Sequence, residues 1–348
     1  MTSHAREESG QVTTPEAAAP TVVVGLNAAI IAVWDDTPQV LTVRSASDPD
    51  RTEGLPSGPF EPRHHRTIDI GLRSWVEEQT ALRLGYVEQL YTFGDRGRLT
   101  AAETDEPHMV SVGYLALTRR STLPANAGAQ WASWYRYFPW EDRRERVPPV
   151  IPELIEPFLR DWARRADTTD LRERRWERAC LVFGLEGLGF HDETVLERYE
   201  LLYESGLVPE ARRDRPHLQA EIGPRLQGCS AGTTALGAAM LHDHRRILAT
   251  AMGRLRGKLK YRPVIFELMP AAFTLLELQR TIEAVAGVRL HKQNFRRLLA
   301  RTGLVEPTGT ISTKTGGRPA EQFRFRRDVL RERPAPGVRL PLPRPHKP

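Results

Sequence analysis

The C-terminal fold is decided by the stretch FTLLELQRTIEAVAGVRLHKQNFRRLLARTG, residues 273–303. It opens with a capping box, because the side chains of Thr274 and Glu277 have the spacing at which each accepts a hydrogen bond from the other's backbone amide. Apolar residues then recur at helical intervals, and Gly287 follows as a residue that tolerates the left-handed backbone of a helix end. The stretch therefore predicts a helix between Thr274 and Gly287.

A second helix is predicted after a short turn. Phe295, Leu298 and Leu299 would share its inner side, and Gly303 would end it. Its outer side would present amide and basic groups, namely Lys292, Gln293, Asn294, Arg296, Arg297 and Arg301. Two helices joined by a short turn, the second with such an outer side, are typical of a helix-turn-helix whose second helix enters the DNA major groove. We therefore expect these six side chains to contact DNA.

A pair of strands is predicted behind the second helix. Phe323 and Phe325 alternate with polar residues, as in a strand with one buried side, and Gly316-Gly317 supplies a turn before that strand. The two strands would form the wing of a winged helix. Lys314 and Arg318 flank the turn, so we expect them to contact phosphates or the minor groove.

The basic charge of the chain is concentrated in this region. Residues 289–327 contain ten Lys and Arg residues and two Glu residues, a net charge of +8, whereas the whole chain carries +6. A local basic patch is the electrostatic footprint of phosphate binding, so double-stranded DNA is the expected partner. Two alternatives stay open: a solvated basic face without a partner, and an RNA partner. The second predicted helix exposes no aromatic side chain, which argues against stacking on single-stranded bases.

Length and composition limit the number of domains and the cellular compartments that fit the chain. A chain of 348 residues suggests two or three domains, and a hydrophobic share of 40% is enough for sizeable cores. The two cysteines, Cys180 and Cys229, offer neither a disulfide framework nor a zinc spacing, so we expect a reducing, cytoplasmic setting. No apolar run is long enough for a membrane span, and residues 1–20 lack the apolar centre of a signal peptide.

The N-terminal part alternates strands and a helix. Residues 21–44 predict two strands, residues 54–60 a loop, and Thr67–Leu82 a helix with Leu72, Trp75 and Val76 on its inner side. Two more strands are predicted at Tyr86–Phe93 and Val110–Leu117. This order favours an α/β sandwich rather than a repeat protein.

Within this sandwich the chain resembles Nudix proteins. Leu55-Pro56-Ser57-Gly58 is similar to the loop before a Nudix box, and Arg73-Ser74-Trp75-Val76-Glu77-Glu78 is similar to the core of the box. The resemblance implies a nucleotide site at Arg73, Glu77 and Glu78, with Glu77 and Glu78 as magnesium ligands beside a bound diphosphate. The box is degenerate, since Ser74 replaces a glutamate and His64 or His65 stands near the position of the upstream one. Without the resemblance, Arg73 and Glu77 would be read as a surface ion pair one helical turn apart.

The resemblance extends to Nudix-related transcriptional regulators of NAD metabolism, the NrtR-like proteins. It is carried by Tyr86–Asp95, by a linker helix at Asp243–Pro263, and by the segments Phe266–Thr274 and Asn294–Arg297. It implies that ADP-ribose or a related nucleotide binds the Nudix-like domain and releases operator DNA. No cofactor is required on this reading, although magnesium could accompany the nucleotide.

The oligomeric state and the role of residues 146–240 can also be predicted. One winged helix reads only a short half-site, so we expect a homodimer, with the linker helix suited to packing between domains or protomers. Residues 146–240 predict a helical insertion that serves packing or dimerisation rather than a second active site. A metal site at His242-Asp243-His244 is disfavoured, because consecutive residues point in different directions, and Asp243 is expected to be an N-cap instead.

The sequence thus predicts an α/β Nudix-like sandwich, a helical insertion and a C-terminal winged helix-turn-helix. The expected parts are a disordered N-terminus (1–20), a Nudix-like domain (21–145), the insertion (146–240), a linker helix (241–262), a winged helix (263–330) and a proline-rich tail (331–348). The leading functional hypothesis is a nucleotide-sensing transcriptional regulator. The alternative is an active pyrophosphohydrolase acting on ADP-ribose-like compounds, which Ser74 argues against because such enzymes need a cluster of carboxylates for magnesium. No catalytic residue is therefore assigned.

Overall fold

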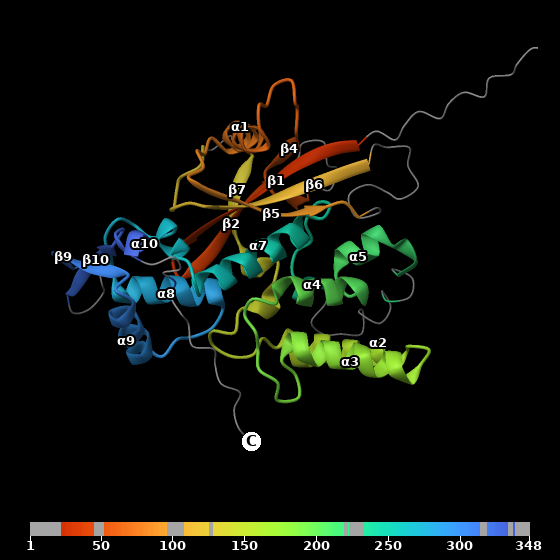
Figure 1. Ribbon diagram of the computed structural model, residues 1–348. Coiled ribbons are helices and arrows are strands. Elements are labelled where there is room, and N and C mark those ends of the chain that lie inside the picture. Colours follow the sequence, from red (N-terminus) through yellow and green to blue (C-terminus); the bar gives the residue numbers. More distant parts are fainter. Residues whose placement is uncertain are drawn as a thin grey trace, which may run out of the picture.

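The computed structural model describes residues 22–44, 52–95, 108–124, 128–218, 222, 233–313, 319–332 and 337. A twisted sheet, a group of helices and a small C-terminal unit pack around one central helix (Figure 1). Cys229, Lys314 and Arg318 lie outside the described residues, as do the expected disordered N-terminus and most of the tail. None of the described helices is both long and apolar enough to cross a membrane.

The sheet is mixed. Its main path runs β3-β2-β1-β6-β5, with β4 paired to β1 and β7 paired to β2. Only the pairing of β1 with β6 is parallel among these neighbours. The strands are β1 (Val22–Trp34), β2 (Thr37–Arg44), β3 (Glu53–Gly54), β4 (Ser57–Pro59), β5 (Tyr86–Phe93), β6 (His108–Leu117) and β7 (Ala129–Ser133).

Both faces of the sheet are covered, which explains why β1 reads as a nearly continuous apolar run. Leu26, Ala28 and Ile30 pack toward α1 (Ile68–Thr80), which contributes Leu72 and Val76. Alternate residues of the same strand, including Ala29 and Ile31, pack toward α7 (His244–Leu259) on the other face. The helix predicted after residue 67 is confirmed, and the Thr67 hydroxyl caps it by accepting a bond from the Ile70 amide at 3.2 Å. Two cores therefore lie on opposite sides of one sheet.

The segment after β7 is helical as predicted. Two short 3₁₀ helices, Trp134–Arg136 and Pro139–Glu141, precede a π-helical turn at Ile151–Ile155. The α-helices α2 (Glu156–Arg164), α3 (Thr169–Phe183), α4 (Val195–Glu204) and α5 (Pro209–Asp214) then follow. Short 3₁₀ helices at Thr233–Leu236 and Val264–Glu267 flank α7.

The C-terminal unit is a winged helix. A three-stranded sheet of order β8-β10-β9 stands behind two helices. The capping box of Thr274 and Glu277 forms in both directions, and Gly287 and Gly303 end the two helices with φ of 72° and 60°. The elements are β8 (Phe273–Thr274), α8 (Leu275–Ala286), α9 (Lys292–Thr302), β9 (Val305–Ser312), β10 (Ala320–Phe325) and α10 (Val329–Glu332).

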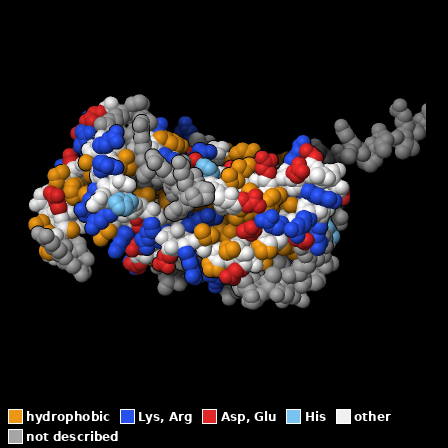
Figure 2. Space-filling model, turned by 90° about the horizontal axis from the view of Figure 1, so that it is seen from below, with side chains coloured by type: hydrophobic (Ala, Val, Ile, Leu, Met, Phe, Trp, Pro, Cys, Tyr) orange, Lys and Arg blue, Asp and Glu red, His pale blue; other side chains and the backbone are white. Residues whose placement is uncertain are grey.

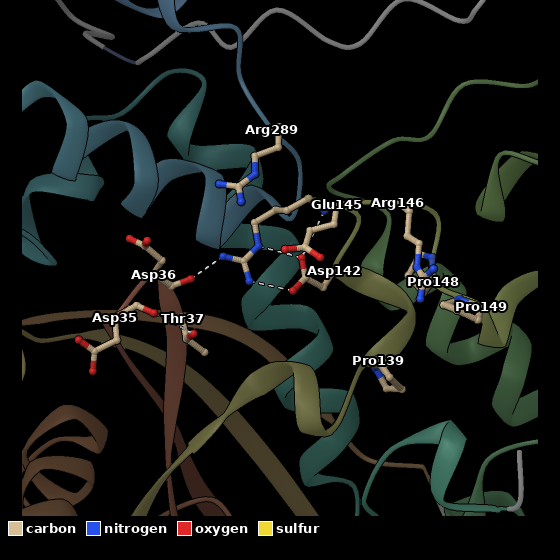
Figure 3. Close-up of a pocket in the computed structure, with 11 residues that line it drawn as sticks. Asp35, Asp36, Thr37, Pro139, Asp142, Glu145, Arg146, Pro148, Pro149 and Arg289 are labelled. Carbon is tan, nitrogen blue, oxygen red and sulfur yellow. Dashed lines mark hydrogen bonds and ion pairs between the residues drawn. The ribbon is translucent and has the colours of Figure 1, made fainter.

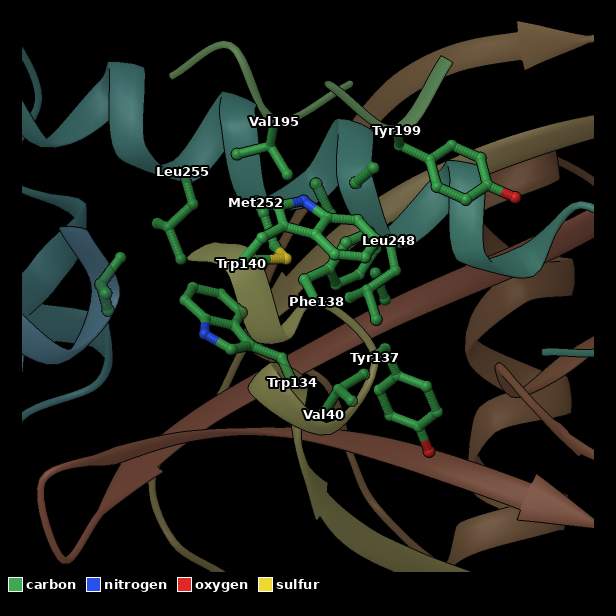
Figure 4. Packing of buried hydrophobic residues seen from close by; sticks show 14 of the residues in the cluster. Val40, Trp134, Tyr137, Phe138, Trp140, Val195, Tyr199, Leu248, Met252 and Leu255 are labelled. Carbon is green, nitrogen blue, oxygen red and sulfur yellow. The ribbon is translucent and has the colours of Figure 1, made fainter. Parts of the chain in front are cut away.

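One hydrophobic core runs through the sheet, the insertion, α7 and the winged helix. At its centre Phe138 and Trp140 meet Tyr199 of α4 and Leu248 and Met252 of α7 (Figure 4). The apolar side of α7 that the sequence suited to packing between domains or protomers is wholly buried within one chain. The domain boundaries predicted from the sequence stay a prediction, but the insertion is packed into the molecule rather than appended to it.

A buried carboxylate lies where these parts meet. Glu141 is fully buried and accepts two bonds from Arg198 of α4, at 2.5 and 2.9 Å, and one from Arg256 of α7, at 2.5 Å. Burial alone would raise the pKa of Glu141, but the two guanidinium groups outweigh it and hold the pKa below its usual value. A second buried pair, Arg245 with Glu210, joins α7 to α5 at 3.1 Å. Charged groups thus fix the insertion and α7 to the sheet domain.

We expect Glu141→Gln to destabilise the folded chain by about 3–5 kcal/mol, because it leaves two buried guanidinium groups without a counter-charge. Urea-induced unfolding followed by circular dichroism measures this loss. Asp142→Asn is the matched control, since Asp142 pairs with Arg144 nearer the surface and its loss should cost only about 1 kcal/mol or less. Equal stability of the two variants would contradict the structural role of Glu141.

Candidate nucleic-acid interface and sensor site

The outer side of α9 is free to meet a partner. Phe295 and Leu299 are buried, whereas Lys292, Gln293, Asn294, Arg296, Arg297 and Arg301 are all exposed. Arg297 donates to the Asn294 side chain at 3.0 Å, so this pair is already oriented on the surface. The side chains of Lys292, Gln293, Arg296 and Arg301 make no hydrogen bond or ion pair with another described residue. The six predicted contact residues therefore lie together on one solvent-facing side of the second helix.

The wing is held by an ion pair, hydrogen bonds and an aromatic contact. On β9 and β10, Arg324 pairs with Glu306 at 2.7 Å, and Thr308 and Thr310 bond to Gln322. Phe325 stacks on Phe266 with ring centroids 4.4 Å apart, which fixes the wing to the start of the unit. Figure 2 shows Lys and Arg side chains spread along the face of the molecule seen there, with Asp and Glu side chains among them. The phosphate contacts predicted for Lys314 and Arg318 fall outside the described residues.

The end of α8 is capped by groups from outside the winged helix. The Tyr135 hydroxyl donates to the Ala284 carbonyl at 2.7 Å, and Arg256 donates through Nε to the Val285 carbonyl at 2.8 Å. The amide of Arg143 donates to the Gly287 carbonyl at 2.8 Å. The last carbonyls of a helix have no partner within it, so these donors satisfy them and hold the helix end against the sheet domain.

Gly287 is required at this contact for a second reason besides its positive φ. A Cβ atom at this position would stand 2.3 Å from the carbonyl oxygen of Glu141. The turn between α8 and α9 therefore lies directly against the segment that follows β7. The position of the second helix is set by the sheet domain as well as by α8.

An open cavity of about 440 Å³ lies at the same junction. It is bounded by the Asp35-Asp36 turn of the β1–β2 hairpin, by residues of the 139–149 segment and by Arg289 in the turn before α9 (Figure 3). Arg144 closes one side by pairing with Asp142 at 2.8 Å and donating to the Asp36 carbonyl. Four acidic and three basic residues line the cavity, so it has no charge preference for a phosphate.

The predicted nucleotide helix, α1, is confirmed as a helix, but its ion pairs differ from expectation. The predicted pairing of Arg73 with Glu77 is wrong: Arg73 pairs with Asp69 at 2.9 Å and also donates to the Leu84 carbonyl at 2.5 Å. Helical side chains lean toward the N-terminus, which favours the partner one turn earlier. Glu77 pairs instead with Arg83 at 2.9 Å, and both groups are exposed.

The residues of α1 do not fit a magnesium-bound diphosphate. Glu77 and Glu78 are neighbours and project about 100° apart on a helix, and Glu77 is engaged by Arg83. Within the described part of the chain, no three His, Cys, Asp or Glu side chains are grouped so as to hold a metal ion. This holds for His242, Asp243 and His244 as well.

The 53–57 loop, which runs from β3 to the first residue of β4, makes contacts that sequence reasoning missed. Glu53 is buried and accepts from Arg44 at 2.7 Å, from Gln130 at 2.5 Å and from the Tyr137 hydroxyl. Burial would raise the pKa of Glu53, but the bonds from Tyr137 and Arg44 lower it overall. Glu53 lies in a short strand without an obvious pattern, so no local signal marked it.

The start of α7 meets the same loop. His244 is buried, and its Nδ1 accepts the Leu55 amide at 2.9 Å. Burial lowers the pKa of His244 to about 3, with a further contribution from His242 and Arg213, so the ring is neutral and can accept. Asp243 occupies the N-cap position, but the predicted capping bond is absent and its carboxylate accepts from Arg246 at 3.1 Å.

The chain therefore joins a mixed-sheet, Nudix-like domain through a linker helix to a winged helix-turn-helix. Residues 265–325 match the family model described as the NrtR DNA-binding winged helix domain. The crystal structure of Shewanella oneidensis NrtR with a 27mer DNA has a TM-score of 0.51 and 18% identity to this chain, covering 88% of it and 94% of the other chain. The crystal structure of Shewanella oneidensis NrtR alone gives the same score and identity and covers 95% of that chain. At this identity the structures establish the fold.

A curated relative from Acinetobacter baylyi, the "ADPR responsive transcriptional repressor NtrR", is 41% identical over 91 residues. The match covers 26% of this chain and 36% of the relative, so it spans about a third of that protein's length. The similarity to NrtR proteins thus lies in the winged helix of residues 265–325 and, over most of the chain, in the fold.

We expect acid to destabilise the chain through His244. Its pKa is near 3 when folded and ordinarily 6.5, so between these values the unfolded chain binds a proton that the folded chain does not. The contribution of the neutral ring is fully present above pH 6.5 and is lost as the pH falls toward 3. One proton corresponds to about 1.4 kcal/mol per pH unit.

His244→Asn keeps a side-chain acceptor but removes the titrating ring, so it should lose this part of the pH dependence. The measurement is the free energy of unfolding in urea, compared for the two proteins between pH 7.5 and pH 5. Parallel pH profiles for the variant and the parent would show that His244 is not a buried neutral acceptor.

Proposed function

We propose that this chain is a DNA-binding transcriptional regulator whose Nudix-like domain responds to ADP-ribose or a related nucleotide. The observation that carries the proposal is the outer side of α9, which presents basic and amide side chains to solvent within a winged helix of the NrtR type. The curated relative is named as an ADP-ribose-responsive repressor, which supports the ligand class and the direction of the response. On this proposal the nucleotide weakens operator binding.

Residues at the start of α9 are the proposed readers of the operator. The N-terminal residues of the second helix of such a motif face base edges, so the Gln293 amide is suited to adenine and Arg297 to guanine or a phosphate. Arg296 and Arg301 lie to either side and are suited to the DNA backbone. Two copies of the chain would read two half-sites about one or two helical turns apart, and the proposed assembly is a homodimer. Because the apolar side of α7 is buried within the chain, the dimer would use another surface.

The alternative of an active pyrophosphohydrolase finds no support in α1. Catalysis of that kind depends on carboxylates gathered on magnesium. Ser74 stands at one of the family's glutamate positions, and Glu77 is held by Arg83. We propose that the nucleotide is bound without efficient turnover.

Base-reading and backbone contacts should respond differently to mutation. We expect Gln293→Ala and Arg297→Ala to cost about 1–3 kcal/mol on the operator and less on a scrambled duplex. Arg296→Ala should weaken both duplexes alike and reduce the salt slope of binding by about one unit. Fluorescence anisotropy at several salt concentrations, with an operator selected from random duplexes, measures both effects.

Arg174→Ala is the matched control for this experiment, because Arg174 is an exposed arginine of α3 in the insertion and pairs with Asp170. It should leave operator binding unchanged. If Gln293→Ala and Arg297→Ala bind the operator as the parent does, α9 is not the reading helix and the proposal loses its main support.

The ligand response is tested with purified chain and ADP-ribose. At a concentration a hundred times its Kd, ADP-ribose should stabilise the fold by about 2.7 kcal/mol and lower the affinity for the operator. Magnesium should not produce hydrolysis at enzyme rates, on the order of 1 per second or faster. NAD, nicotinamide mononucleotide and ATP serve as comparison ligands. Rapid magnesium-dependent cleavage of ADP-ribose would favour the hydrolase instead.

A further inference from the structure

The loop at residues 53–57 is held between α1 and α7. On the α1 side, Gln79 forms two bonds with Ser57, donating to its carbonyl at 2.7 Å and accepting from its amide at 3.1 Å. On the α7 side, His244 accepts the Leu55 amide, and a Cβ on Gly54 would stand 2.9 Å from the same ring nitrogen. The loop therefore cannot shift without disturbing either the Nudix-like helix or the start of the linker helix.

One hydrogen-bonded route leads from this loop to the winged helix through α7. His244 is the first residue of that helix, and Arg256 lies twelve residues further on. A helical segment of this length is about 18 Å long and moves as a unit. Arg256 donates to the Val285 carbonyl in the last turn of α8 at 2.8 Å. A displacement at the loop is thus carried to the end of α8.

A second route leads through the segment after β7. The Tyr137 hydroxyl bonds to Glu53 at the start of the loop, and Tyr135, two residues earlier, donates to the Ala284 carbonyl at 2.7 Å. Ala284 and Val285 are adjacent, so both routes end on the same turn of α8. That turn is followed by Gly287 and then by the short connection to α9.

The turn after α8 is tightly packed. Gly287 lies against the Glu141 carbonyl, closer than any side chain would allow, and its own carbonyl is held by the Arg143 amide. Glu141 is in turn fixed by Arg198 of the insertion and by Arg256. Packed contacts of this kind switch between discrete arrangements rather than deforming continuously.

We infer that Tyr135 and His244 are positioning residues that convert a change at the 53–57 loop into a change in the orientation of α9. Neither residue lies on the proposed DNA surface, and neither belongs to α1. The inference rests on the proposed function, because it states how nucleotide binding reaches the DNA-reading helix. It also gives the insertion a role, since Arg198 holds the side chain of Glu141, and the turn packs against the backbone carbonyl of the same residue.

The test measures a coupling factor, the ratio of the operator Kd with saturating ADP-ribose to the operator Kd without it. Tyr135→Phe removes only the hydroxyl that bonds to Ala284, and His244→Leu removes the acceptor of the Leu55 amide. Each should reduce the coupling factor by roughly 2- to 30-fold, the range found for residues between coupled sites. His244→Asn retains an acceptor and should keep most of the coupling.

Tyr203→Phe is the matched control, because it removes a tyrosine hydroxyl that bonds to Asp214 within the insertion at 3.0 Å and does not contact α8. Its coupling factor should equal that of the parent. Thermal unfolding shows which variants fold, and Tyr135→Phe decides the question if His244→Leu does not fold.

The outcomes separate the two proposals. A parent chain whose operator affinity does not respond to ADP-ribose overturns the proposed function, and the inference with it. A parent that responds, together with Tyr135→Phe and folded His244→Leu variants that respond equally, overturns the inference alone. A reduced coupling factor in Tyr135→Phe, with Tyr203→Phe unchanged, supports it.

Discussion

The buried carboxylate of Glu141 is the constraint on which the assembly of this molecule depends. A charge taken out of water is costly unless it is paired, and here one carboxylate compensates two guanidinium groups that would otherwise be buried alone. Arg198 comes from the insertion and Arg256 from the linker helix, and Arg256 also donates to the last turn of α8. The pairing therefore specifies how the four parts of the chain meet.

The insertion is part of the buried interior of the molecule. Helices α4 and α5 each supply a charged residue, Arg198 or Glu210, to a buried pair with the sheet domain or with α7. The insertion completes the core around Trp140 and Met252, so its role is to hold the linker helix in place. The sheet domain and the winged helix consequently share one interior.

The winged helix could be predicted from the sequence because its signals are local. The capping box at Thr274, the glycines that end both helices and the alternation before Phe325 each act within a few residues. Glu141 and His244 could not be predicted in this way, since their partners lie 57 and 189 residues away along the chain. The ion pair of Arg73 could not be predicted either, although its possible partners are close in sequence. Asp69 and Glu77 each lie one helical turn away. Which of them pairs with Arg73 depends on side-chain direction and on the Leu84 carbonyl, to which Arg73 also donates.

The proposed nucleotide-sensing domain and the winged helix are joined by hydrogen bonds at the end of α8. Hydrogen–deuterium exchange of the full chain, with and without ADP-ribose, tests this most directly because it reports local opening along the whole chain. We expect ADP-ribose to alter exchange in peptides covering residues 282–290 as well as in those covering residues 53–80. A change confined to residues 53–80, with residues 282–290 unaffected, would contradict it.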